Sequence, residues 1–184
     1  SILDVDLPTA EALARELSQC GPGRAEAIRC DISRPNEIRE AIAATIARHG
    51  RLDCLINNAG AHPPATTIDD TRLEDVESLF RLNFLGTYAG CKYAVPHLRE
   101  TRGTIVNISS MTAVLGQDRS SAYAATKGAQ LSLTKALAVE LGPQGIRVNA
   151  VLPSNVDTPL MRDWAATLAD PQSALERVAA LQVF

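Results

Sequence analysis

Short apolar runs alternate along the chain with longer stretches in which apolar residues recur every three or four positions. The apolar runs predict strands, which we place at residues 1–5, 25–30, 52–57, 103–109 and 145–153. The amphipathic stretches predict helices at residues 8–19, 34–50, 71–99 and 121–141, followed by two short helices within residues 157–181. Pro8 is expected to open the first helix, Gly50 to close the second, and Pro96 to disturb the third.

The predicted strands are continuous apolar runs, which is typical of strands that are buried on both faces. Strand–helix–strand repetition with such strands predicts a parallel sheet and a doubly wound α/β fold. Ligands bind such sheets beyond the carboxyl ends of the strands. The first candidates for function are therefore the residues at these ends, namely Asp4, Asp31, residues 57–60, Ser109, Ser110 and residues 153–159.

The composition fits a single domain over residues 1–184 and narrows its class. The 184 residues carry a net charge of -3, and 46% of them are hydrophobic, which suffices for a core. No basic stripe indicates a nucleic-acid partner, and no apolar run has the length of a membrane span. The start lacks the regions of a signal peptide, so we expect a cytoplasmic protein. Its four cysteines and three histidines show no metal-ligand spacing, so no metal is expected.

One candidate for chemistry is a tyrosine followed four positions later by a lysine, Tyr123 and Lys127, in the predicted helix 121–141. Residues four apart share one face of a helix. An ammonium beside a phenol favours the phenolate, which lowers the tyrosine pKa and brings proton exchange nearer to neutral pH. Taken alone, the pair fits a chance placement on a helix surface at least as well.

The strand ends together resemble the classical short-chain dehydrogenase/reductase family over nearly the whole chain. The motifs are "NNAG" at residues 57–60, "NFLGTY" at 83–88, "VNISS" at 106–110 and "YAATK" at 123–127. The distance from Ser110 to Tyr123 also matches the family's serine–tyrosine spacing. Within the family, "NNAGAHPP", "NFLGTY" and "NVDTPL" resemble most the type 14 17β-hydroxysteroid dehydrogenases and their bacterial relatives.

The resemblance implies an alcohol dehydrogenase or ketoreductase whose catalytic residues are Asn83, Ser110, Tyr123 and Lys127. Tyr123 would be the general acid/base, and Lys127 would lower the phenol pKa and hold the nicotinamide ribose. Ser110 would hydrogen-bond the substrate oxygen, and Asn83 would hold a water of a proton relay. On the residues alone, Ser110 fits a turn cap, and Asn83 fits the surface of a helix.

The cofactor that the resemblance implies is NAD rather than NADP. The residues assigned to its site are Asp4, Asp31, Ile32, Asn57, Ala59, Gly60, Tyr123, Lys127, Pro153, Val156 and Thr158. Asp4 would bind the adenosine ribose and repel a 2′-phosphate, although Asp6 is an alternative acid. Where the family usually has proline–glycine, this chain has Pro153–Ser154, and a serine is tolerable where φ is negative.

Two parts of the family pattern are missing from these residues. They are the first strand with its TGxxxGxG phosphate loop, and the final strand. In the family the first strand lies at the centre of the sheet, so we expect a gap there with two unpaired strand edges. We therefore expect the 184 residues to be a portion of a longer protein and, alone, to bind NAD weakly or not at all and to lack activity.

The substrate and the assembly are also expectations at this point. His62, Met111, Leu115, Met161 and Trp164 are candidates to line a mostly apolar pocket for a steroid-like or smaller alcohol or ketone. The helices near residues 71–99 and 121–141 carry apolar residues beyond one stripe, which predicts a homodimer or homotetramer. The alternatives are a non-catalytic binding or scaffold protein and a related epimerase or dehydratase.

Overall fold

The structure is a computed structural model that describes residues 1–166 and 168–180. Its strands and long helices run along the chain in the order β1 (Ile2–Asp4), α1 (Leu7–Gln19), β2 (Ala27–Arg29), α2 (Pro35–His49), β3 (Cys54–Asn57), α3 (Leu73–Phe80), a π-helix (Arg81–Leu85), α4 (Gly86–Thr101), β4 (Thr104–Ile108), α5 (Ser121–Leu141), β5 (Arg147–Val151), α6 (Pro159–Ala166) and α7 (Pro171–Ala180). Single 3₁₀ turns follow β4 (Met111–Ala113) and α5 (Gly142–Gln144). The predicted strands and helices are all present, and the strands are shorter than expected.

All strand pairs are parallel, which confirms the doubly wound α/β class. β1 pairs with β2, while β3, β4 and β5 form a second sheet in that order, with Ile105 opposite both Leu55 and Val148. Within the described residues, nothing pairs with the second edge of β1 or of β3. The break falls where the resemblance places the family's first strand, so the expected gap in the sheet is confirmed.

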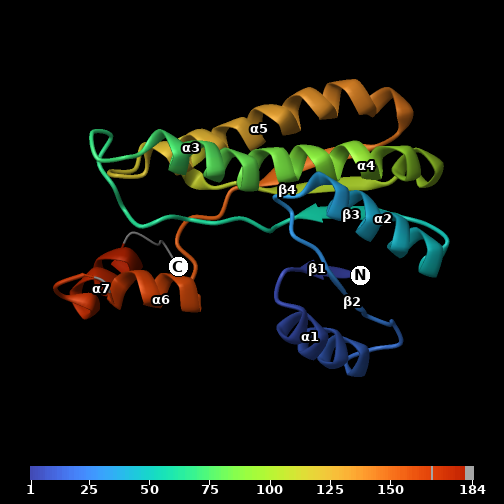
Figure 1. The fold of residues 1–184 in the computed structure, drawn as a ribbon, viewed down its shortest axis with the longest axis horizontal. Coiled ribbons are helices and arrows are strands. Elements are labelled where there is room, and N and C mark those ends of the chain that lie inside the picture. Colours follow the sequence, from blue (N-terminus) through green and yellow to red (C-terminus); the bar gives the residue numbers. More distant parts are fainter. Residues whose placement is uncertain (167, 181–184) are drawn as a thin grey trace.

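The main core lies between three helices and the strands beside them. α2, α4 and α5 form one layer, with α2 against α4, α4 over β3 and α5 over β5 (Figure 1). Wholly buried side chains such as Leu98, Ile105 and Ile146 fill this layer. β1, β2 and α1 lie below its right end in Figure 1, and α6 and α7 form a separate pair near the loop after β5. The carboxyl ends of β3, β4 and β5 are thus backed by a rigid layer of helices.

The long third helix is interrupted at Asn83 rather than at Pro96. Residues 81–85 form a π-helical turn, whereas Pro96 lies inside α4 without ending it. Val95 and Leu98 are buried on either side of Pro96, and their packing holds the helix where one backbone hydrogen bond is lost. π-turns inside α-helices are often found at functional sites. The helix is therefore disturbed at residues 81–85, and the prediction that Pro96 would disturb it was wrong.

Membrane-spanning helices and metal-binding clusters are both absent from the described residues. No helix in residues 1–166 and 168–180 has the length and hydropathy to cross a membrane. Within the same residues, no group of three or more His, Cys, Asp or Glu side chains is placed to hold a metal ion. All four cysteines are free thiols; Cys30 and Cys91 are buried, and Cys20 and Cys54 are exposed.

Candidate active site

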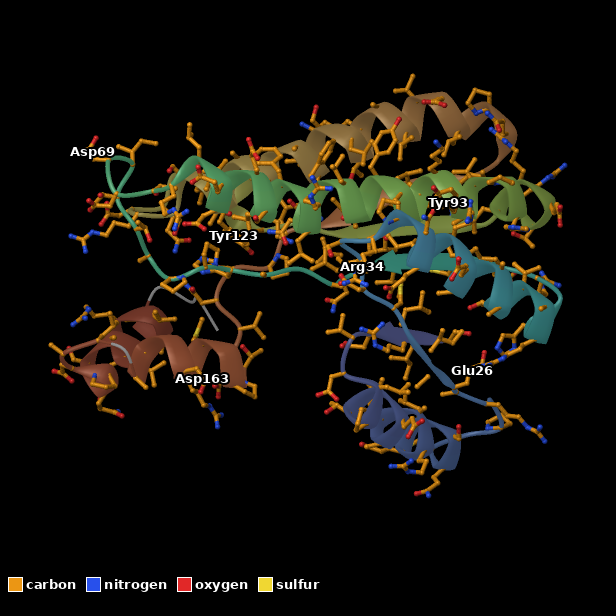
Figure 2. All side chains as sticks on the ribbon, viewed as in Figure 1. Glu26, Arg34, Asp69, Tyr93, Tyr123 and Asp163 are labelled. Carbon is orange, nitrogen blue, oxygen red and sulfur yellow. The ribbon has the colours of Figure 1, made fainter. Side chains whose placement is uncertain are left out.

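Three loops meet at the carboxyl ends of β3, β4 and β5. The Met111 N–H donates to the Pro153 carbonyl over 2.9 Å, which ties the loop after β4 to the loop after β5. The Thr66 N–H donates to the Arg119 carbonyl over 2.9 Å, which ties the loop after β3 to the segment before α5. In Figure 2, Tyr123 lies at this junction, on the side of α5 that faces the loop after β3. The parallel sheet therefore assembles one site from residues far apart in the sequence.

Ser110 and Tyr123 are brought into contact at this junction. The Ser110 hydroxyl oxygen accepts the Thr112 N–H over 3.2 Å, and the same side chain is near enough to Tyr123 to lower the pKa of its phenol. Ser110 thus caps a turn and faces the phenol at once, so the two interpretations of this serine are compatible. Burial raises the pKa of Tyr123, and Ser110 lowers it only in part. The expectation of a lowered phenol pKa is wrong in this arrangement because desolvation outweighs the favourable contacts.

Lys127 is buried directly beneath this tyrosine. Its side chain is 5% exposed, and Nζ lies 5.7 Å from the centre of the Tyr123 ring. Nζ donates a hydrogen bond to the Ile108 carbonyl over 2.8 Å, at the last residue of β4. The Ser109 hydroxyl donates to the Lys127 carbonyl over 2.8 Å, which fixes this turn of α5 on the strand end. Burial of the ammonium lowers the pKa of Lys127 to about 8.

Asn83 binds the loop after β3 with its side-chain amide. Oδ1 accepts the Ala61 N–H over 2.9 Å, while Nδ2 donates to the Ala61 carbonyl over 2.9 Å and to Thr126 Oγ1 over 3.2 Å. A Cβ on Gly60 would lie 3.0 Å from Asn83 Oδ1 and 3.7 Å from Lys127 Nζ. Gly60, Asn83 and Lys127 therefore meet at one point, and a side chain at residue 60 would occupy it.

Asn57 points into the protein rather than into the loop. Its Nδ2 donates to Asn107 Oδ1 over 2.8 Å and to the Cys91 sulfur over 3.4 Å. A Cβ on Gly90 would lie 2.6 Å from Asn57 Oδ1, so this close approach requires glycine in α4. The side chain of Asn57 thus joins β3 to β4 and α4. The backbone of residues 58–60, including Ala59, is left at the sheet edge.

The two acids near β1 have different partners. Asp6 caps α1 by accepting the Thr9 N–H and the Thr9 hydroxyl, so both of its oxygens are engaged. Asp4 is exposed at the end of β1, and one of its oxygens accepts the Asp6 N–H over 2.9 Å. Of the two acids, Asp4 is the one that keeps an oxygen without a hydrogen-bond partner among the described residues.

Asp31 and Ile32 are positioned by the start of α2 and by α4. Asp31 accepts the Ser33 N–H and hydroxyl, which lower the pKa of its carboxyl, and it faces Arg34 over 3.4 Å. A Cβ on Gly86 would lie 2.9 Å from the Ile32 carbonyl, so the turn packs closely on α4. Asp4 and Asp31 follow the β1–β2 sheet, whereas the serine, tyrosine and lysine follow the other sheet.

The loop after β5 is placed by its two ends. At one end the Pro153 carbonyl accepts Met111, and at the other Thr158 Oγ1 accepts the Met161 N–H over 3.3 Å as α6 begins. Val156 is exposed between them. Ser154 is exposed as well, so the serine that replaces the family's glycine meets no crowding.

A cavity of about 470 Å³ lies beside Tyr123, between α3, the loop before α3 and the start of α5. Its lining mixes apolar residues, such as Leu79 and Leu82, with the charged Asp75 and Arg119. Of the predicted pocket residues, His62, Met111, Leu115 and Met161 do not line it, and the side chain of Trp164 lies outside the part that the structure describes.

Three residues at the site take their roles from contacts that the structure shows. The His62 ring, a candidate pocket residue from sequence, stacks on Tyr123 with centroids 4.2 Å apart and planes inclined by 57°. Arg119, with a positive φ of 53°, supplies the carbonyl that joins two loops. Gln130 is wholly buried against Asn83. Of the two residues that sequence reasoning missed, Gln130 carries a signal, as a polar residue one helical turn after Lys127, and Arg119 carries none.

Comparison with protein families and curated proteins gives a consistent result. A family model described as short chain dehydrogenase matches residues 1–169. An L-fucose dehydrogenase from Oryctolagus cuniculus is 44% identical over 181 residues, which cover 98% of this chain and 62% of that protein. A meso-2,3-butanediol dehydrogenase from Serratia marcescens is 32% identical over 160 residues, covering 87% and 63%. The chain thus spans about three fifths of the length of these relatives.

Solved structures share the fold. Levodione reductase superposes with a TM-score of 0.92 at 27% identity, covering 97% of this chain and 71% of that one. NAD+-bound xylitol dehydrogenase gives a TM-score of 0.84 at 26% identity, covering 97% and 72%. ElxO with NADP bound gives a TM-score of 0.73 at 35% identity, covering 77% and 58%. The relatives named here do not include a steroid dehydrogenase, so the steroid-type subgroup stays a prediction.

Proposed function

Because the chain belongs to the short-chain dehydrogenase family, we propose that the full-length protein interconverts a secondary alcohol and a ketone with a nicotinamide dinucleotide. The contact of Ser110 with Tyr123 above the buried Lys127 carries this proposal. A buried ammonium destabilises the folded state, and such groups are found mainly at functional sites. A scaffold protein would not require one. The same grouping is suited to moving one proton to or from a substrate oxygen.

The proton transfer uses the chain's own groups. In alcohol oxidation the Tyr123 oxygen takes the hydroxyl proton, and in ketone reduction it returns that proton to the carbonyl oxygen. Ser110 donates a hydrogen bond to the same oxygen and stabilises the charge that develops on it. Because burial raises the pKa of Tyr123, the phenol of the ligand-free chain holds its proton at neutral pH, which suits ketone reduction. For alcohol oxidation the phenol must first release that proton, so oxidation is expected to be faster at higher pH.

The residues present fit a nicotinamide cofactor at one edge of the sheet. Gly60 leaves open the space in which a Cβ would approach Asn83 and Lys127, and Lys127 can bind ribose hydroxyls there. The loop with Pro153, Val156 and Thr158 would face the carboxamide. When bound, the nicotinamide supplies the acceptor or donor of the hydride.

We assign the adenosine end to Asp4, Asp31 and Ile32, with NAD as the preferred cofactor. The free oxygen of Asp4 can accept a hydrogen bond from a ribose hydroxyl, and its charge repels a 2′-phosphate. The structures compared above include both an NAD+ and an NADP complex, so the preference rests on Asp4 alone.

Replacing Asp4 by alanine is expected to narrow the NAD/NADP preference by about 10-fold or more. A carboxylate and a phosphate about 4 Å apart repel by roughly 1–4 kcal/mol, and the substitution removes this term. The measurement is kcat/KM for each cofactor. The control Asp6→Ala should cost about 1 kcal/mol of stability through the lost helix cap and leave the preference unchanged. A parent enzyme that already prefers NADP would show that Asp4 is misassigned.

For the substrate, we propose a small alcohol with more than one hydroxyl group. The most similar relatives described above are named for L-fucose and a butanediol. The cavity beside Tyr123 places polar groups, Asp75 and Arg119, among apolar ones. The apolar, steroid-like substrate predicted from sequence is the competing choice.

A substrate panel tests this proposal. The full-length protein is assayed with NAD and L-fucose, 2,3-butanediol, xylitol and a 17β-hydroxysteroid, and kcat/KM is compared. We expect the hydroxylated small molecules to exceed the steroid. A reversed order would restore the apolar substrate, and no turnover with any alcohol or the corresponding ketones would reject the dehydrogenase proposal.

We also propose a homodimer or homotetramer formed through α4 and α5. The assembly is predicted from apolar residues in the helices 71–99 and 121–141. Of these, Leu79 and Val95 are buried within the chain, whereas Tyr88 and Val139 are exposed by 49% and 78%. A groove of about 300 Å³ runs between the two helices, with Leu133 and Leu137 on its α5 side. Apolar residues that remain exposed along such a groove are suited to a second copy.

Light scattering on the full-length protein at micromolar concentration is expected to give the mass of a dimer or tetramer. Tyr88→Glu places a charge on the exposed face and should shift the mass towards the monomer. The control Glu74→Gln, on an exposed residue of α3, should not. A monomeric parent would contradict the proposed assembly.

A further inference from the structure

The buried face of α5 is polar, although it packs inside the protein. Thr126, Lys127, Gln130 and Thr134 lie on this face, and none is more than 5% exposed. A buried polar side chain costs free energy unless it is hydrogen-bonded. The hydrogen-bond partners of these four residues therefore show which groups this face of α5 positions. Of the four, only Lys127 has been assigned a role in the proposed reaction.

Gln130 bonds to the π-turn that carries Asn83. Its Nε2 donates to the Asn83 carbonyl over 2.8 Å and to Thr87 Oγ1 over 2.6 Å. The Thr87 hydroxyl donates to the same Asn83 carbonyl over 2.9 Å. Two side-chain donors thus engage both lone pairs of this oxygen.

The orientation of the Gln130 amide follows from its partner. A carbonyl oxygen can only accept, so the amide nitrogen must face Asn83. Oε1 then faces away, and no donor in the described residues reaches it, although it is buried. An apolar side chain of the same length would avoid that unsatisfied atom. The unsatisfied Oε1 of Gln130 therefore destabilises the fold, while its Nε2 holds the Asn83 carbonyl.

The Asn83 contact leads back to the phenol. The Asn83 side chain holds both backbone groups of Ala61, and the next residue, His62, stacks on Tyr123. A rotation of the π-turn would move the Asn83 amide, the loop and the histidine ring together. Asn83, within this turn, also lies next to the position that a Cβ on Gly60 would take, close to Lys127 Nζ.

We propose that Gln130 is a positioning residue, which locks the π-turn at Asn83 and thereby fixes the loop carrying His62 against Tyr123. This inference rests on the proposed dehydrogenase function, because it concerns the placement of that function's acid/base. It also assigns the Asn83 carbonyl to Gln130 and Thr87.

The test compares three variants of the full-length protein. Gln130→Met keeps the length of the side chain and removes both donors, and Gln130→Glu removes the donors when ionised. Thr134→Val is the control on the same buried face. It removes the acceptor of Asn107 Nδ2 and the donor to the Gln130 carbonyl, but leaves the hydrogen bonds of the Gln130 side chain to the π-turn in place. Thr134→Val should lower Tm because Asn107 Nδ2 loses its acceptor, and Gln130→Glu should lower Tm because a carboxylate then faces the Asn83 carbonyl. Gln130→Met removes the unsatisfied Oε1 and leaves Thr87 as a donor to the Asn83 carbonyl, so it should change Tm least.

Two readouts separate positioning from stability. For Gln130→Met and Gln130→Glu we expect kcat to fall about 10-fold or more with the KM for NAD within about two-fold, because the acid/base is misplaced. For Thr134→Val we expect the parent's kcat. The NMR signals of the His62 ring should lose the ring-current shift from Tyr123 in both Gln130 variants and keep it in Thr134→Val.

The outcomes also separate this inference from the proposed function. An active parent and a Gln130→Met variant with parental kcat and His62 signals would overturn the positioning role and leave the dehydrogenase intact. If Gln130→Glu does not fold, the kcat and His62 signals of Gln130→Met still test the positioning role. An inactive parent would reject the proposed function, and the His62 signals would still show whether Gln130 holds the loop.

Discussion

Tyr123→Phe in the full-length protein is expected to lower kcat by at least about 10²–10⁴-fold, the range typical of general acid–base catalysis. The substitution removes only the phenolic oxygen, which is the atom that Ser110 contacts and that we assign to proton transfer. The ring remains to stack on His62, so the loop after β3 should keep its position. Steady-state kinetics with the best alcohol of the panel measure the effect, and a titration with NAD should show little change in affinity.

The matched control for this substitution is Tyr93→Phe. Tyr93 lies on α4 and packs against the core, away from the loops at the strand ends (Figure 2). Its variant loses the same atom from the same kind of ring and should keep the parent's kcat. Turnover of Tyr123→Phe within a few-fold of the parent would remove this tyrosine from the mechanism.

Lys127→Met is expected to lower kcat by about 10²-fold or more and to make the ligand-free protein more stable at pH 7. The ammonium is buried with one hydrogen bond, to the Ile108 carbonyl, so its charge destabilises the fold. The lowering of its pKa from 10.5 to about 8 corresponds to a cost on the order of 3 kcal/mol. A residue that costs stability and supplies charge at the site is typical of a functional position.

The pH dependence gives this prediction a definite sign. Below about pH 8 the lysine is charged in the folded and in the unfolded chain, and the full penalty of burial is present. Between about pH 8 and 10.5 the folded state has lost the proton and the unfolded state still binds it, so the parent gains stability as pH rises. The advantage of Lys127→Met in free energy of unfolding should therefore shrink over this range.

Denaturant unfolding of the two proteins at pH 7 and pH 10 measures the difference. Lys135→Met, on an exposed residue of the same helix, serves as the control and should change neither kcat nor the pH dependence. If Lys127→Met is less stable than the parent at pH 7, the ammonium stabilises the fold. Its role would then be structural rather than catalytic.

The parts of the fold that local sequence specifies were predictable. The helix over residues 121–141 matches α5, and Gly50 ends α2 with the left-handed φ of 73° that only glycine adopts easily. The break between the two sheets followed from the resemblance, because the strand that the family places between β1 and β3 is missing from these residues. The two helix features depend on periodicity and on glycine, both of which act over short stretches.

The features that failed depend on contacts between distant segments. The π-turn contains Asn83, whose carbonyl accepts a hydrogen bond from Gln130 on another helix, whereas Pro96 is tolerated by packing. The pKa of Tyr123 rises because loops from three strand ends bury it, and the spacing to Lys127 carries no information on that burial. Asn57, which the resemblance assigns to the cofactor site, ends β3, and its side chain bonds to Cys91 and Asn107, which lie far from it in the sequence.

The central claim is that the protein moves a hydride between a secondary alcohol and NAD while Tyr123 takes the proton. The most direct measurement uses an alcohol of the panel deuterated at the carbon that bears the hydroxyl, mixed with NAD and excess full-length protein. Mass spectrometry should find the deuterium on the reduced nicotinamide and an equal amount of ketone, and Tyr123→Phe should form both far more slowly. Bound NAD without any deuterium transfer, from every alcohol of the panel, would contradict the account.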